Sequence, residues 1–258
     1  MATESEPLRR FYDELADFYH LIFEDWSQSI ARQSEALSRI LSERWGITSG
    51  DIIDAAVGVG TQSLGLAARG FNVIGADISF RAVHRARREA ATRQLRLPVL
   101  AADFRSLPFR SGSADAIIAC DNALPHLLSM REIRGALAEF MRCLRPRGAV
   151  MISMRDYATP PPAGTAEYRP YGEREWNGRK YFAEQEWHWN GPTYDLVLRV
   201  FCLDADSKTA DLNVQTTYFA VAIADILTLM SEVGFRDVHR VDDVYYQPVL
   251  VGTAPAER

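Results

Sequence analysis

A glycine-containing loop between a predicted strand and a predicted helix constrains this chain most. Residues 54–60 read Asp-Ala-Ala-Val-Gly-Val-Gly, and they open onto an expected helix at 61–69. Glycine allows the backbone to approach a ligand closely, because it carries no Cβ. The start of the helix adds unpaired N–H groups and the positive end of its dipole. The loop therefore predicts a binding site for a carboxylate or a phosphate at the end of a buried strand.

The chain around this loop alternates strands and helices. Short apolar runs bounded by turn residues or charges are typical of buried parallel strands. Such runs lie at 51–57, 71–76, 98–102, 114–120 and 149–154. Further helices are expected at 8–20, 27–45, 79–94, 130–144 and 223–233. With two last strands at 238–241 and 245–251, the pattern predicts an α/β fold with a mostly parallel sheet.

The pattern changes after residue 154. The next segment contains three successive prolines and many tryptophans and tyrosines, and it is too aromatic for a disordered linker. Alternating stretches that predict antiparallel strands follow at 180–189, 194–203 and 210–219, with a turn at 204–208. We predict that residues 156–219 form a small β-rich cap. This cap would be inserted into a ligand-binding domain made of residues 1–155 and 220–258.

Composition narrows the classes of partner. The 258-residue chain has a formal net charge of −5, and its densest basic stretch, 81–96, lacks aromatics. We interpret that stretch as a solvated helix face and expect no nucleic acid. No apolar run approaches the roughly 20 residues that span a bilayer, and the first ten residues lack a signal-peptide core. We therefore expect a cytoplasmic protein without a membrane partner. The three cysteines and five histidines show no metal-ligand spacing, so no metal site is predicted.

Acidic residues end three successive predicted strands. A carboxylate at Asp77 can accept both hydroxyls of a ribose, and Asp103 with Phe104 suits an adenine amino group and ring. A dinucleotide fingerprint would place glycine or alanine where Ser63 stands, which counts against NAD. With Asp54 beside the loop, the site is lined with acids. Such a site fits the sulfonium and ammonium groups of S-adenosylmethionine (SAM) better than a pyrophosphate.

These motifs resemble those of the class I SAM-dependent methyltransferases. The match covers about residues 51–154 and includes the loop, with Ala56 at its usual first glycine, and Cys-Leu-Arg-Pro-Arg-Gly at 143–148. The resemblance implies a Rossmann-like fold, a central and mostly parallel sheet with helices on both faces. It also implies SAM as cofactor and methyl transfer to a small molecule.

A narrower resemblance is to glycine/sarcosine N-methyltransferases. It rests on Asp25-Trp26 with Arg32, on Asp-Asn-Ala-Leu-Pro-His-Leu at 121–127, and on Arg-Asp-Tyr at 155–157. The sequence departs from the family at Asp121, where glycine is usual, and at Pro125. The implied cofactor-binding residues are Tyr19, Trp26, Arg32, Ala56, Gly58, Gly60, Asp77, Ile78, Asp103, Phe104, Cys120 and His126. The implied substrate-positioning residues are Asn122, His126, Arg155 and Tyr218.

Several of these residues have a second interpretation. Arg155 can hold a carboxylate through two parallel hydrogen bonds, or form a surface ion pair with Asp156. Asn122 can face the substrate or make an Asx turn, and His126 can contact the cofactor or act as a base. The leading hypothesis is methyl transfer to the amine of a small molecule. The alternatives are an O- or C-methyltransferase of a specialised metabolite and a non-catalytic SAM- or nucleoside-binding protein. A homo-oligomer is compatible with the sequence.

Overall fold

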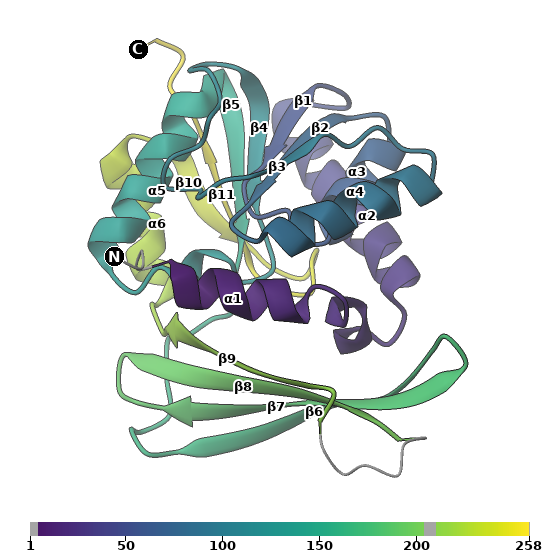
Figure 1. Ribbon diagram of the computed structural model, residues 1–258. Coiled ribbons are helices and arrows are strands. Elements are labelled where there is room, and N and C mark those ends of the chain that lie inside the picture. Colours follow the sequence, from purple (N-terminus) through teal and green to yellow (C-terminus); the bar gives the residue numbers. More distant parts are fainter. Residues whose placement is uncertain (1–4, 204–209, 258) are drawn as a thin grey trace.

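The computed structural model describes residues 5–203 and 210–257, so the turn expected at 204–208 lies outside the described residues. The chain forms two sheets. A seven-stranded sheet carries helices on both faces, and a four-stranded antiparallel sheet lies beneath one edge of it (Figure 1). This arrangement confirms the predicted α/β fold with a Rossmann-like, mainly parallel sheet.

The large sheet has the strand order β10-β11-β5-β4-β1-β2-β3. Its strands are β1 (Asp51–Asp54), β2 (Asn72–Asp77), β3 (Val99–Ala101), β4 (Ala114–Ala119), β5 (Leu144–Ser153), β10 (Arg236–Val241) and β11 (Val249–Thr253). The pairs among β1 to β5 are parallel, whereas β11 pairs antiparallel with both β5 and β10. The carboxyl ends of the five parallel strands therefore meet at one edge of the sheet.

Helices cover the two faces of this sheet. They are α1 (Glu6–Leu15), η1 (Tyr19–Ile22), α2 (Trp26–Trp45), α3 (Thr61–Ala68), α4 (Phe80–Thr92), η2 (Leu124–His126), α5 (Met130–Cys143) and α6 (Ile223–Val233). Figure 1 shows α5 and α6 on one face and α2, α3 and α4 on the other. Side-chain caps define several starts: the Ser79 hydroxyl accepts from the backbone N–H of Ala82, and Ser129 caps α5 in the same way.

The two faces have separate cores, because successive strand residues point to opposite sides. In β1, Ile52 packs with the α2, α3 and α4 side, and Ile53 packs with the α5 and α6 side. Both side chains are buried, as are Ile117 and Ile118 at the neighbouring positions of β4. Each such burial contributes roughly 1.5–3 kcal/mol. The packing on both sides fixes the edge where the strands end.

The small sheet lies between β5 and α6 in the sequence. It consists of β6 (Ala166–Trp176), β7 (Arg179–Trp189), β8 (Thr193–Cys202) and β9 (Leu212–Phe219), in that spatial order. Alternate residues of β7 and β8 are buried, which gives the sheet one packed face. Helix α1 lies between β9 and the carboxyl edge of the large sheet (Figure 1). The first helix of the chain therefore separates the two sheets.

Several expectations about these elements were wrong. The strand expected at 149–154 already begins at Leu144. The strand expected at 51–57 ends at Asp54, and the one expected at 245–251 begins at Val249. The helix expected at 8–20 ends at Leu15 and is followed by the separate turn η1. Strand β6 was not predicted at all. Its register shifts between Pro170 and Gly172, so the alternation that identifies a strand is interrupted there.

Candidate active site

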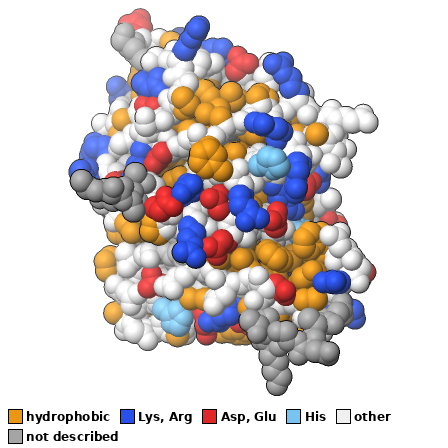
Figure 2. Space-filling view, viewed as in Figure 1, with side chains coloured by type: hydrophobic (Ala, Val, Ile, Leu, Met, Phe, Trp, Pro, Cys, Tyr) orange, Lys and Arg blue, Asp and Glu red, His pale blue; other side chains and the backbone are white. Residues whose placement is uncertain are grey.

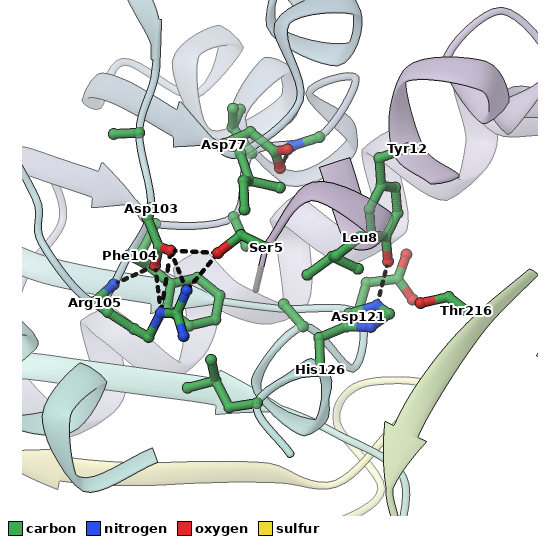
Figure 3. A pocket seen from close by; sticks show the side chains of 18 of the residues that line it. Ser5, Leu8, Tyr12, Asp77, Asp103, Phe104, Arg105, Asp121, His126 and Thr216 are labelled. Atoms are coloured by element: carbon green, nitrogen blue, oxygen red, sulfur yellow. Dashed lines mark hydrogen bonds and ion pairs between the residues drawn. The ribbon is translucent and has the colours of Figure 1, made fainter. Parts of the chain in front are cut away.

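A cavity of about 770 Å³ lies at the carboxyl edge of the large sheet. The ends of β1 to β4 form one side of it. Helix α1 and the residue before it cover the opposite side through Ser5, Pro7, Leu8 and Tyr12. Strand β9 of the small sheet adds the segment 215–217 to the wall. Figure 3 shows its two ends, with Asp103 at one and Asp121 at the other. Ligands of open α/β sheets bind at this edge.

The glycine loop shapes the middle of the cavity. Gly58 and Gly60 both have positive φ, at +51° and +98°, which favours glycine strongly. No atom lies within 4 Å of the place where a Cβ of Gly58 would stand, so the loop faces open space. Gly60 is the N-cap of α3 and does not itself line the cavity. The loop thus presents backbone to a ligand in front of a helix start.

Asp77 at the end of β2 is tied to this loop. Its carboxylate accepts from the backbone N–H of Gly58 at 2.8 Å and of Ser79 at 2.9 Å. Burial raises the pKa of Asp77 to about 6, although these hydrogen bonds oppose the shift. Burial also raises the pKa of Asp54 to about 7, and the hydroxyl of Ser63 donates to that carboxylate at 2.6 Å. Asp77 lines the cavity and keeps lone pairs for two hydroxyl donors.

Asp103 and Phe104 lie at one end of the cavity. The Asp103 carboxylate receives two hydrogen bonds from the Arg105 guanidinium, with Nη2 at 2.6 Å from Oδ2. Ser5 also donates to it at 3.3 Å, and Arg105 pairs in addition with Glu132 (Figure 3). These contacts tie the beginning of α1 to the end of β3. The backbone N–H of Arg105 also donates to Oδ1 at 2.9 Å, so an adenine amino group beside the ring of Phe104 would replace one of these donors on Asp103.

The other end of the cavity combines side chains from distant segments. Asp121 and Cys120 follow β4, and Tyr12 comes from α1. The Tyr12 hydroxyl lies 2.6 Å from Nε2 of His126, and the Tyr218 ring lies 4.0 Å from the His126 ring. The pKa of His126 is lowered to about 3, mainly by burial and to a lesser extent by the positive charge of Arg155. His126 is therefore neutral at physiological pH.

Nine of the residues implied for the cofactor line the cavity. They are Tyr19, Ala56, Gly58, Asp77, Ile78, Asp103, Phe104, Cys120 and His126. Trp26 does not line it: its indole N–H donates to Thr61 at 2.9 Å, and Arg85 and Arg93 lie over its ring. Arg32 is exposed on α2 and does not line the cavity either.

The implied substrate residues lie beside the cavity on the side of the small sheet. Asn122 is buried, and its amide bonds the Tyr157 hydroxyl at 2.8 Å and the backbone N–H of Arg155 at 3.0 Å. It therefore ties the end of β4 to the end of β5. The Arg155 guanidinium lies 4.8 Å from the centre of the Trp187 ring, and Tyr218 stacks on Tyr194. His126 is the one member of this set that also lines the cavity.

Sequence reasoning missed several lining residues. Ser5, Leu8 and Tyr12 were overlooked because a helical pattern does not tell where a helix docks. On α2, the residue that faces inward is Gln33 rather than Arg32. Gln33 is buried and bonds Gln62, a cavity residue, at 2.7 Å.

The cavity fits SAM by its chemistry. Acids at the ends of β2 and β3 suit a ribose and an adenine, and the open loop suits the methionine end. The net acidic lining also suits a ligand with two positive groups and one carboxylate. Among the described residues no Lys lines the cavity, and its arginines, Arg105 and Arg131, lie with Glu132 among the lining residues.

Comparisons with known proteins agree with this geometry. Residues 52–148 match the family model described as a methyltransferase domain. The chain is 30% identical over 222 residues to a glycine/sarcosine N-methyltransferase of Parasynechococcus marenigrum (strain WH8102), covering 85% of this chain and 73% of that protein. It is also 36% identical over 110 residues to a demethylmenaquinone methyltransferase of Clavibacter sepedonicus, covering 43% and 42%.

Among solved structures, the chain resembles SAM-bound CalS10, an amino pentose methyltransferase from Micromonospora echinaspora. The TM-score is 0.73 at 16% identity, over 92% of this chain and 94% of that one. The chain belongs to the class I SAM-dependent methyltransferases. It is an enzyme that uses SAM to methylate a small molecule, which sets aside the non-catalytic alternative and an NAD enzyme. None of the helices in the described residues has the length and apolar character needed to cross a bilayer.

Proposed function

We propose that the methyl acceptor is the amine of a small molecule that carries a carboxylate. The observation that carries this proposal is the state of Arg155. Its guanidinium makes no ion pair or side-chain hydrogen bond within residues 5–203 and 210–257, although it is surrounded by Tyr157, Tyr194 and Tyr218. Arg155 does not form the surface ion pair with Asp156 that the sequence allowed, because Asp156 pairs with Arg240. An unpaired arginine in such surroundings suits a ligand carboxylate.

The acid–base properties of the site support an amine over a hydroxyl. A neutral amine attacks without a base, whereas an alcohol or phenol more often needs one with a pKa near the working pH. His126 has its pKa lowered to about 3 by burial, so it is a weak base. Burial raises the pKa values of Tyr12, Tyr19 and Tyr218 well above their usual value of 10. These groups are poorly suited to activate a hydroxyl.

A matched pair of acceptors and a matched pair of variants test the proposal. Glycine and sarcosine are compared with glycinamide, which lacks the carboxylate, by the S-adenosylhomocysteine released. Arg155→Ala should raise KM for the carboxylate-bearing acceptors by about 30-fold, equivalent to roughly 2 kcal/mol for a charged hydrogen-bonded pair. The affinity for SAM should change less than twofold. Arg169→Ala is the control, because Arg169 also lies over Trp187 but pairs with Glu167. An unchanged KM in Arg155→Ala would contradict the role.

The second candidate is an O- or C-methyltransferase. It is favoured by the similarity to the demethylmenaquinone methyltransferase named above, over 43% of the chain. In that case His126 would act as a base, although its lowered pKa makes it a weak one. A pH–rate profile before and after His126→Ala separates the two functions. Loss of an ionisation in the variant supports the hydroxyl or carbon acceptor, and an unchanged profile supports the amine.

A further inference from the structure

The strand ends form an ordered row along the carboxyl edge. Asp103 follows β3, Asp77 ends β2, the glycine loop follows β1, Asp121 follows β4, and Arg155 follows β5. The sheet order places β4 between β1 and β5. Asp121 therefore lies between the loop that suits the methionine end of SAM and the arginine that suits the acceptor. This is where the transferred group must pass.

The carboxylate of Asp121 is held firmly at this place. Its backbone has a φ of +59°, and its N–H donates to the Ser153 hydroxyl at 2.8 Å. The hydroxyl of Tyr19 donates to Oδ2 at 2.5 Å, and the hydroxyl of Tyr246 donates to Oδ1. The two phenols come from η1 and from the loop between β10 and β11, and Ser153 belongs to β5, so three separate segments hold Asp121 in place. Asp121 lines the cavity beside Tyr12 and His126 (Figure 3).

Asp121 has no cationic partner within the described part of the chain. The other two acids of the row that line the cavity are satisfied differently: Asp103 pairs with Arg105, and Asp77 accepts from backbone N–H groups. Each oxygen of Asp121 accepts one phenol and keeps a further lone pair. A partly enclosed, fixed anion with free acceptor capacity suits a ligand cation.

Asp121 and Arg155 act on the same space. Their strands are neighbours, and the amide of Asn122, next to Asp121, bonds the backbone of Arg155 at 3.0 Å. Both charges act on Tyr171: its pKa is raised to about 12, mainly by burial, while Arg155 acts to lower it and Asp121 to raise it. Two opposite charges, neither paired with the other, therefore border the region of the acceptor. This pattern complements an acceptor with an anionic group and a neutral nitrogen that becomes cationic on methylation.

We propose that Asp121 binds the acceptor nitrogen and stabilises the positive charge that methyl transfer creates on it. The proposal rests on the amine acceptor proposed above. In this reaction the nitrogen lone pair forms the new N–C bond while the C–S bond breaks and its electron pair stays on sulfur. One positive charge thus moves from sulfur to nitrogen, and no proton needs to move. A carboxylate hydrogen-bonded to the nitrogen favours that movement.

A binding experiment tests this role without knowledge of the acceptor. Sinefungin carries an ammonium group where SAM carries its methyl group, whereas S-adenosylhomocysteine has neither group there. Calorimetry should show that Asp121→Asn weakens sinefungin binding by at least tenfold and changes S-adenosylhomocysteine binding less than twofold. The control is Asp156→Asn, an acid of the same edge that pairs with Arg240. It should leave both affinities unchanged.

Two results would overturn the role of Asp121. If both ligands lost affinity equally, Asp121 would serve the methionine ammonium that they share. If neither lost affinity, no carboxylate would face the methyl position. Asp121→Gly is a second variant, with the glycine usual in the resembled family, and it should give the same selective loss. Because no turnover is measured, a failure of this test is distinguishable from a failure of the amine proposal.

Turnover gives a second measurement once glycine or sarcosine is accepted. Asp121→Asn should lower kcat by about 30- to 100-fold, comparable to the loss of one oriented group that stabilises transition-state charge. Arg155→Ala, in contrast, should act mainly on KM. A rise in KM with an unchanged kcat for Asp121→Asn would show a binding role without charge stabilisation, and the proposal would be wrong.

Discussion

The two halves of the site are built in different ways. The half that suits the adenosine uses residues at the ends of β1, β2 and β3, and Asp77 is bonded directly by the neighbouring loop. The half that faces the acceptor draws Tyr12 from α1, Asp121 from the end of β4 and Tyr218 from β9. The first half is built mainly from neighbouring strand ends, with Ser5 added at Asp103, whereas the second is assembled from segments far apart in the chain. Changes in the two halves should therefore separate cofactor affinity from acceptor use.

The largest effect is expected at Asp77. Asp77→Ala should weaken SAM and S-adenosylhomocysteine binding by about 100-fold, since two hydrogen bonds to a charged group contribute roughly 1.5 kcal/mol each. Titration calorimetry measures this directly. Asp17→Ala is the control, because Asp17 is an exposed acid that pairs with Arg81. A loss of SAM affinity of less than fivefold in Asp77→Ala would show that cofactor binding does not depend on this carboxylate, and the contrast between the two halves would be wrong.

Asn122 should affect stability and acceptor binding rather than SAM affinity. Asn122→Ala leaves the Tyr157 hydroxyl and the Arg155 N–H without this partner, which should lower the free energy of unfolding by about 2 kcal/mol. KM for the acceptor should rise, and SAM affinity should change less than twofold. Urea unfolding and calorimetry measure the two quantities. Asn213→Ala, at an exposed position of β9, is the neutral control. An equal loss of SAM affinity would show that the halves are coupled.

The pH dependence of cofactor binding should follow Asp77. Its pKa in the folded protein is raised to about 6, and the ribose hydroxyls need the charged form. SAM binding should therefore weaken about tenfold as the pH falls from 7.5 to 5. The free energy of unfolding without ligand should change in the opposite direction. Because the folded pKa of Asp77 is raised, its contribution to this free energy declines as the pH rises from about 4 to 6. A pH-independent affinity between 5 and 7.5 would contradict the assignment.

The smallest effects concern two adjacent residues of α2. Arg32→Ala should change SAM affinity less than twofold, because Arg32 is exposed and away from the cavity. Gln33→Ala should weaken it about threefold, because Gln33 holds Gln62 in the cavity wall at 2.7 Å. Each variant is the control for the other in the same calorimetric titration. A larger loss of SAM affinity in Arg32→Ala than in Gln33→Ala would support the cofactor contact that the family resemblance implies for Arg32.

Sequence reasoning located the cavity wall at the strand ends better than the wall contributed by α1. Asp77 and Asp103 could be found because parallel strands end at a common edge, so that strand ends locate a site. Residues 245–248 were misinterpreted as part of the last strand, which begins at Val249. Tyr245 and Tyr246 have high strand propensity, but their hydroxyls bond Gln33 and Asp121 instead. Side chains used for a site do not follow the alternation of a strand.

The solvated helix face expected at 81–96 is found for Arg81, Arg87 and Arg88, which are exposed, but Arg85 is buried. Three arginines of the basic stretch 81–96 form ion pairs, with Arg81 bonded to Asp17, and Arg85 and Arg93 bonded to Glu89. On the face shown in Figure 2, positive and negative side chains are interspersed rather than gathered into one basic patch.

The position of Arg32 on α2 could not be derived from the sequence, since a shift of one residue turns a helical side chain by about 100°. That rotation exchanges Arg32 for Gln33.

The position of α1 has a practical consequence for handling the protein. Ser5 and Pro7 already belong to the cavity wall, so a purification tag joined at the N-terminal side enters the neighbourhood of the cofactor. Strand β11 runs antiparallel to β5, and the chain after Thr253 leaves from the opposite edge of the sheet. A carboxyl-terminal tag or surface attachment therefore keeps the cavity entrance clear. Calorimetry and kinetics on this enzyme are best made with the amino-terminal end left free.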